Sequence, residues 1–170
     1  AAIDKAKEEG DSLGGVVELE SEPGKGTRFT IRLPLTLSII NAMLIRAGGQ
    51  TYAVPVTNIV ETALYKHEDI MTAQAREMID FRGRVIPFLR LTRLFDLPEE
   101  ETKGKYVHAL VLQSGRKTAA LAVDQLIGQQ EIVIKSLGTY LGDVPGISGA
   151  TILGDGKVAL IIDCASILYA

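Results

Sequence analysis

The chain of 170 residues has one cysteine, no tryptophan and only 5% aromatic residues. A single cysteine excludes an internal disulfide framework, and it excludes a metal site built from clustered cysteines. We expect Cys164 to be a small apolar residue in a buried strand. Because aromatic side chains are few, aliphatic side chains must fill the core.

Long apolar runs and an excess of one charge sign are also missing. No run of about 18 apolar residues could span a membrane, and no export signal is visible, so the sequence predicts a cytoplasmic protein without direct membrane insertion. The chain has 18 Lys and Arg against 21 Asp and Glu, a net charge of −3. Without a sustained basic stripe, nucleic acid is not an expected partner.

Residues suited to catalysis are sparse and scattered. The two histidines, His67 and His108, lie far from Cys164 along the chain, and none of the three has a catalytic motif around it. The isolated carboxylates Asp124 and Asp155 favour turn formation, and Asp163 favours capping of a helix. We therefore expect no catalytic residue and no metal site.

From about residue 35 onward the sequence alternates short apolar segments with glycine turns, the pattern of small β-barrels or a sandwich. Each turn predicts a hairpin. The turns are Gly48-Gly49, Arg82-Gly83, Ser114-Gly115 and Gly154-Asp155-Gly156.

Prolines and helix signals complete this pattern. Proline cannot donate to a strand ladder, so Pro55 and Pro87 should lie at edges, strand ends or bulges. Residues 91–95 and 165–169 are short helical candidates. The polar interval 98–104 predicts a boundary between two sub-barrels; the alternative is a surface loop within one barrel.

The N-terminal part has a different character. Residues 1–10 predict a short helix that ends at Gly10. Alternating apolar and charged residues on both sides of a glycine-rich turn then predict a hairpin over residues 17–33. A lone hairpin is only marginally stable, so this segment should belong to something larger.

The turn of this hairpin is a weak candidate for anion binding. Glycines at Gly24 and Gly26 would let backbone amides approach a phosphate, and the Thr27 hydroxyl could donate to it. The spacing matches neither the dinucleotide-binding nor the Walker pattern, and a plain hairpin turn needs the same glycines.

Two segments are candidates for docking a protein. Residues 81–93 contain four arginines among apolar residues and no carboxylate, a mixture common at protein interfaces, although a solvated barrel face is equally compatible. The loop at residues 144–149 is the second guess. The nominated side chains are Arg82, Arg84, Val85, Phe88, Arg90, Val144, Gly146 and Ile147.

Several longer motifs resemble one family. Gly14-Gly15-Val16, the run from Ser21 to Thr27 and the run from Ile31 to Leu37 are similar to the end of the ATP-binding domain of the chemotaxis histidine kinases (CheA) and its junction with the following regulatory domain. Gln113-Ser114-Gly115, the run from Val123 to Lys135 and the run from Gly146 to Gly156 resemble the CheW-like domain of the same kinases. The resemblance covers residues 12–169.

The resemblance implies a mainly β fold: two small SH3-like β-barrels in a CheW-like regulatory domain at residues 36–170, preceded at residues 1–35 by an incomplete α/β remnant of the histidine-kinase ATPase domain. It implies that this domain binds the coupling protein CheW and the cytoplasmic tips of chemoreceptors, in arrays associated with the membrane, and couples receptor signals to kinase activity in two-component signal transduction.

The resemblance also bears on chemistry. In the family, the turn matching Gly24, Gly26 and Thr27 lies beside the bound nucleotide, and the intact kinase uses ATP and magnesium. The other nucleotide-binding motifs, the phosphoacceptor domain and the dimerisation helices are absent from this sequence. We therefore expect no catalysis and no cofactor here; the alternative is a residual nucleotide-binding fragment of the ATPase domain.

Overall fold

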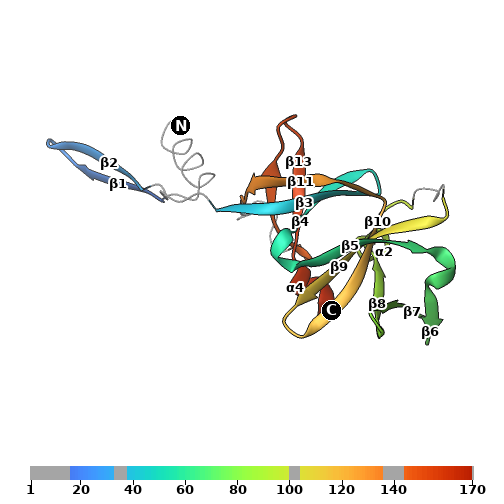
Figure 1. Ribbon diagram of the computed structural model, residues 1–170. Coiled ribbons are helices and arrows are strands. Elements are labelled where there is room, and N and C mark those ends of the chain that lie inside the picture. Colours follow the sequence, from blue (N-terminus) through green and yellow to red (C-terminus); the bar gives the residue numbers. More distant parts are fainter. Residues whose placement is uncertain (1–15, 33–37, 100–103, 136–143, 170) are drawn as a thin grey trace. The chain divides into compact units, whose positions relative to one another are not determined.

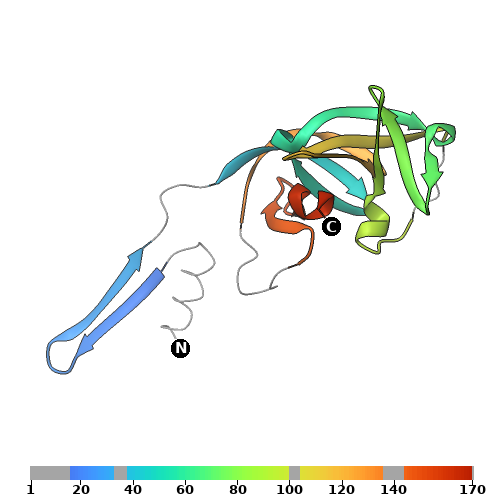
Figure 2. The ribbon, with the colours of Figure 1, turned by 90° about the horizontal axis from the view of Figure 1, so that it is seen from below.

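The structure, a computed structural model, describes residues 16–32, 38–99, 104–135 and 144–169. Apart from a few short helical turns, the described chain consists of β-strands and their connections (Figures 1 and 2). It divides into two compact units, Ala1–Ser38 and Ile39–Ala170.

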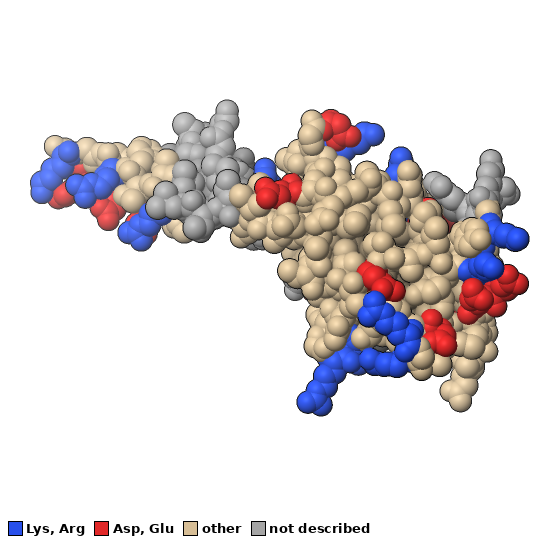
Figure 3. All heavy atoms as spheres, viewed as in Figure 1, with Lys and Arg blue, Asp and Glu red and all other residues tan. Residues whose placement is uncertain are grey.

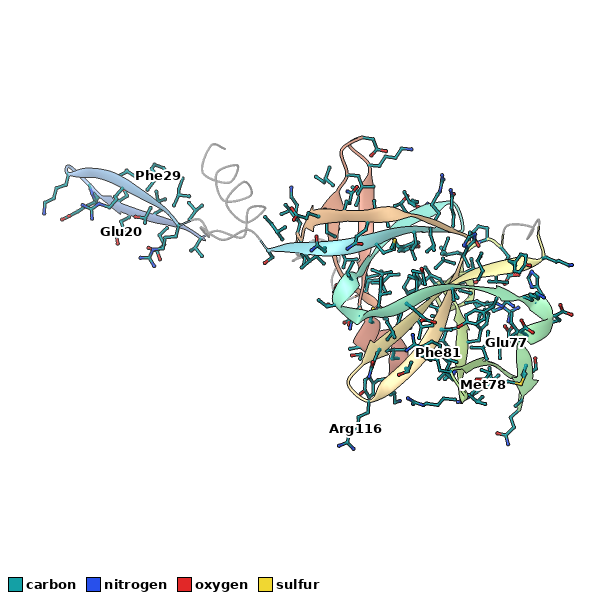
Figure 4. The ribbon with its side chains drawn as sticks, in the orientation of Figure 1. Glu20, Phe29, Glu77, Met78, Phe81 and Arg116 are labelled. Atoms are coloured by element: carbon teal, nitrogen blue, oxygen red, sulfur yellow. The ribbon has the colours of Figure 1, made fainter. Side chains whose placement is uncertain are left out.

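The described part of the first unit is the predicted hairpin. Strands β1 (Val16–Glu22) and β2 (Gly26–Arg32) pair antiparallel, with Leu19 opposite Phe29. Because side chains alternate between the two faces of a strand, apolar residues share one face and charged residues the other. Figure 4 labels Phe29 on the first face and Glu20 on the second. The helix predicted for residues 1–10 lies outside the described residues.

The second unit contains a five-stranded sheet with the order β11-β3-β4-β13-β12. Lys135, just beyond the end of β11, bridges Ala150 of β12 through two backbone hydrogen bonds of 2.8 and 2.9 Å. Because β11 and β12 are the outer strands, this bridge closes the sheet on itself. The strands are β3 (Ile39–Ala47), β4 (Gln50–Pro55), β11 (Gln125–Val133), β12 (Ile147–Ile152) and β13 (Val158–Ile162).

The same unit contains a six-stranded sheet with the order β5-β9-β10-β8-β7-β6. It curls so that Tyr65 of β5 meets Phe88 of β8 edge-to-face, with ring centroids 6.4 Å apart. The strands are β5 (Ile59–Lys66), β6 (Met71–Ala73), β7 (Arg76–Phe81), β8 (Arg84–Arg90), β9 (Tyr106–Ser114) and β10 (Lys117–Val123).

The hairpin of β9 and β10 is buried on both of its faces. Val107, Ala109 and Val111 pack into the core that the six-stranded sheet encloses. Leu110 and Leu112, on the other face of β9, pack into a core shared with the five-stranded sheet. A third core lies inside the five-stranded sheet. The two sheets are therefore joined through one continuous apolar wall.

The predicted hairpins are confirmed at all four glycine turns, as β3–β4, β7–β8, β9–β10 and β12–β13. The two predicted helices form as α2 (Leu91–Leu94) and α4 (Cys164–Leu168), and 3₁₀ turns occupy η1 (Val56–Asn58) and η2 (His67–Asp69). Asp163 caps α4 as predicted, since its carboxylate accepts from the backbone N–H of Ser166.

Three expectations need correction. Cys164 is buried at the start of α4 and not in a strand. Pro87 lies inside β8 and not at its end. The strand tolerates a proline there because β8 changes its pairing partner at this position: residues up to Pro87 pair with β7, and residues from Phe88 onward pair with β10. The interval 98–104 does not separate two barrels, because β8 and β9 on either side of it belong to one sheet. The chain instead leaves the five-stranded sheet after β4 and returns at β11.

Asp124 joins the end of this excursion to the five-stranded sheet. Its carboxylate accepts a hydrogen bond of 2.8 Å from the backbone N–H of Gly48, 76 residues away, in the β3–β4 turn. Its own backbone N–H donates to Arg46 O over 2.9 Å. The structural role predicted for this isolated carboxylate is confirmed, although the turn it stabilises is remote in sequence.

Replacing Asp124 with alanine should lower the free energy of unfolding by about 1–3 kcal/mol, because the partly buried N–H of Gly48 loses a charged acceptor. Urea unfolding followed by circular dichroism measures the change. The matched control is Asp155→Ala, which removes a 2.9 Å bond to the N–H of Lys157 in an exposed turn and should cost clearly less. Equal losses in the two variants would show that the contact to Gly48 carries no special weight.

The thiol of Cys164 should not react with a disulfide reagent at pH 8 until the chain is unfolded. Burial, and secondarily the charge of Asp163, raise its pKa from 9.0 to about 12. The thiolate then forms in the unfolded chain well before it forms in the folded one. Stability should therefore fall as the pH rises from about 9 towards 12, and less steeply in Cys164→Ala. Identical pH profiles for both proteins would contradict this.

Candidate functional site

The predicted phosphate-contacting turn is an open hairpin turn. Gly24 and Gly26 have φ of 83° and 116°, and a side chain at either position would meet nothing within 4 Å. The Thr27 and Ser21 hydroxyls are 3.1 Å apart, and Lys25 pairs with Glu22 at 2.8 Å. Within residues 16–32, the only described part of this unit, no segment faces the turn to form a second wall.

Three of the four arginines in residues 81–93 pair with carboxylates from elsewhere in the chain. Arg82 in the β7–β8 turn pairs with Glu61 of β5 at 2.7 Å. Arg90 of β8 and Arg93 of α2 share Glu77 of β7, at 3.0 and 2.7 Å. Figure 4 labels Glu77 together with Phe81 on β7. Residues 81–93 contain no carboxylate in sequence, but in the folded chain carboxylates from other segments lie beside their arginines.

Arg93 is held by a second carboxylate as well. It donates to Glu99 over 3.2 Å, and the hydrogen bonds to Glu99 and Glu77 raise its pKa. Glu77, Arg90 and Arg93 line a shallow hollow of about 380 Å³ beside β8 and α2. The hollow offers a ligand little unbalanced charge, because Glu77 and Glu99 together balance Arg90 and Arg93.

Burial separates the nominated docking residues into two groups. Phe88 is only 3% exposed and belongs to the core of the six-stranded sheet, so its nomination was wrong. Arg90 is held in the half-buried ion pair with Glu77. Arg84 and Val85, the latter 60% exposed, remain available on the surface of the β7–β8 hairpin.

The loop before β12 divides in the same way. Val144 is exposed, Ile147 packs against the shared core, and Gly146 is buried. Gly146 has φ of 83°, and a Cβ there would lie 2.8 Å from a ring carbon of Phe95. Its carbonyl accepts from the N–H of Asp163 at the start of α4. Gly146 therefore positions α4, and its nomination as a contact for a partner was wrong.

A row of exposed aliphatic side chains crosses the outer face of the five-stranded sheet. Val133 of β11 lies opposite Ile39 of β3, and Ile152 of β12 lies opposite Val158 of β13. Extending the antiparallel bridge between Lys135 and Ala150 by two residues places Val133 beside Ile152. We call Ile39, Val133, Ile152 and Val158 the aliphatic row.

The aliphatic row is unusual because its members are adjacent. Ile39, Ile152 and Val158 are 57, 56 and 59% exposed, and Val133 is half-buried. Single exposed aliphatic side chains are normal on protein surfaces, whereas contiguous ones mark contact sites. In Figure 3, uncharged residues cover most of the visible face of the second unit.

No local pattern in the sequence indicates the aliphatic row. Each member belongs to a predicted or observed strand, but whether it points outward depends on the pairing of four strands that are far apart along the chain. The alternation of side chains along one strand assigns residues to two faces of the sheet, but it does not show which face another part of the chain covers.

The described part of the chain contains neither a candidate metal site nor a candidate membrane-spanning helix. Residues 16–32, 38–99, 104–135 and 144–169 contain no group of three His, Cys, Asp or Glu side chains able to hold a metal. No helix among them is long and apolar enough to cross a membrane.

Comparison with known proteins places the chain in a family. The CheW-like domain family matches residues 41–170. The chain is 47% identical to chemotaxis protein CheA of Bacillus subtilis over 98% of its own length and 25% of that protein's. It is 42% identical to chemotaxis protein CheA of Treponema pallidum, covering 98% of the chain and 21% of that protein. The chain thus spans about a quarter of the length of these relatives.

A solved structure supports the fold. The scaffolding protein TtCheW of Thermoanaerobacter tengcongensis superimposes with a TM-score of 0.54 at 19% identity, over 74% of this chain and 90% of that one. This likeness is consistent with the predicted SH3-like fold, and the resemblance to the CheA kinases is confirmed. The chain belongs to the CheW-like domain family.

Proposed function

We propose that this chain is a docking module of a chemotaxis histidine kinase. It binds the coupling protein CheW and the cytoplasmic tips of chemoreceptors, and it passes receptor state to the kinase within cytoplasmic complexes at membrane arrays. The observation that carries the proposal is the aliphatic row on a domain of the CheW-like family.

The physical argument rests on burial of apolar surface. Covering one Val or Ile side chain contributes about 1.5–3 kcal/mol, so four adjacent ones supply enough to offset part of the cost of association. The strands beneath the row are fixed by ladders and by the bridge at Lys135, so little order must be gained on binding. A rigid apolar strip is therefore suited to a protein partner.

The β7–β8 hairpin is a poorer docking surface than the aliphatic row. Arg82 and Arg90 already have carboxylate partners, and a partner protein would have to desolvate or exchange these pairs. Two of the residues nominated there are exposed: Arg84, which forms no ion pair among the described residues, and the uncharged Val85. Val85 thus serves as a test of the rival surface.

We expect no nucleotide binding by this chain and no cofactor. One open turn at Gly24, Gly26 and Thr27 offers too few contacts to offset the cost of association. Titration calorimetry with ATP and magnesium at millimolar concentration should show no binding. Saturable heat that disappears in Thr27→Val would instead support the nucleotide-binding alternative.

Purified chain should bind cognate CheW at tens of micromolar or tighter, and Ile152→Lys should weaken this at least about tenfold, because it places a charge in an apolar contact. Titration calorimetry or co-elution measures the affinity. Since Ile152 is 56% exposed, the variant should keep the thermal unfolding midpoint of the unmodified chain.

The matched control is Val85→Lys, which introduces the same charge at a residue 60% exposed on the other sheet. It should leave the affinity unchanged. Loss of binding in Val85→Lys with no change in Ile152→Lys would move the docking site to the β7–β8 hairpin. No binding of the unmodified chain to CheW would refute the docking function.

A further inference from the structure

The strand at the centre of the aliphatic row also carries two opposite charges on its outer face. Ile132 of β11 is buried in the core of the five-stranded sheet, and Ile134 packs against the same core. Because side chains alternate along a strand, Glu131, Val133 and Lys135 all face outward. Glu131 and Lys135 are exposed, and among the described residues neither forms an ion pair.

These charges lie on opposite sides of the row. Glu131 lies two residues before Val133 and is opposite Asn41 of β3. Lys135 lies two residues after Val133 and bridges Ala150 of β12. Four residues of strand separate them by about 13 Å. Asp155 and Lys157, in the nearby β12–β13 turn, have opposite signs within two residues and so largely cancel.

An aliphatic strip by itself does not fix the direction of its partner. Apolar contacts are non-directional, so a partner rotated by half a turn about an axis perpendicular to the sheet could bury nearly the same surface. Charges of opposite sign at the two sides remove this ambiguity, because one orientation pairs them and the other opposes like charges.

We propose that Glu131 and Lys135 fix the orientation of the protein docked on the aliphatic row. The partner presents an apolar surface with a Lys or Arg on the side of Glu131 and an Asp or Glu on the side of Lys135. This inference rests on the proposed docking function and adds to it the charge pattern that the partner must carry.

The test measures binding of cognate CheW to the charge reversals Glu131→Lys and Lys135→Glu. Each should weaken binding about five- to tenfold at low salt and less at 0.5 M salt, because the lost attraction is screened. The double variant should bind more tightly than either single variant, because a partner that docks in the opposite orientation can again pair both charges. Reversal of one Lys or Arg on CheW should restore binding to Glu131→Lys, and reversal of one Asp or Glu should restore it to Lys135→Glu.

The matched controls are Lys66→Glu and Glu68→Lys, which reverse exposed charges at the end of β5 and in η2. They should change affinity less than twofold. If Ile152→Lys weakens binding but the Glu131 and Lys135 reversals behave like these controls, the orienting role is overturned while docking stands. If the unmodified chain does not bind CheW, both proposals fail.

Discussion

The β9–β10 hairpin is the element on which the second unit depends, because it is buried on both faces. Sheets that face water on one side alternate apolar and polar residues, whereas strands buried on both sides form continuous apolar runs. The run Ala119–Val123 in β10 is of the second kind, with every residue buried. One face completes the core of the six-stranded sheet, and the other completes the core shared with the five-stranded sheet. A polar group anywhere along this run would be desolvated without a partner.

This shared wall explains the path of the chain. The five-stranded sheet takes its strands from both ends of the second unit, and the six-stranded sheet takes the segment between them. Asp124 lies between β10 and β11, where the chain re-enters the five-stranded sheet, and it bonds to the β3–β4 turn of that sheet. The five-stranded sheet cannot form from one uninterrupted stretch of sequence, and its strands share a core with β9 and β10 of the six-stranded sheet, so the two sheets should unfold together.

The arginine-rich segment and the aliphatic row differ in whether their charged residues form ion pairs within the chain. On the six-stranded sheet, arginines are paired with Glu61, Glu77 and Glu99, and the network is locally balanced. On the five-stranded sheet, the aliphatic row is flanked by Glu131 and Lys135 without ion-pair partners among the described residues. The first arrangement stabilises the fold locally. The second leaves two exposed charges of opposite sign beside an apolar surface.

The sequence by itself determined the hairpins, the short helices and the family, because turn glycines, alternation and long motifs are local properties. It also determined the capping role of Asp163, which acts within three residues. Only the tertiary structure decided that Phe88 and Gly146 are interior, that Arg82, Arg90 and Arg93 pair with carboxylates from outside their own segment, and that the strands on either side of 98–104 belong to one sheet. The same holds for the aliphatic row: whether Ile39, Val133, Ile152 and Val158 meet depends on pairing between strands separated by up to a hundred residues, which no local pattern encodes.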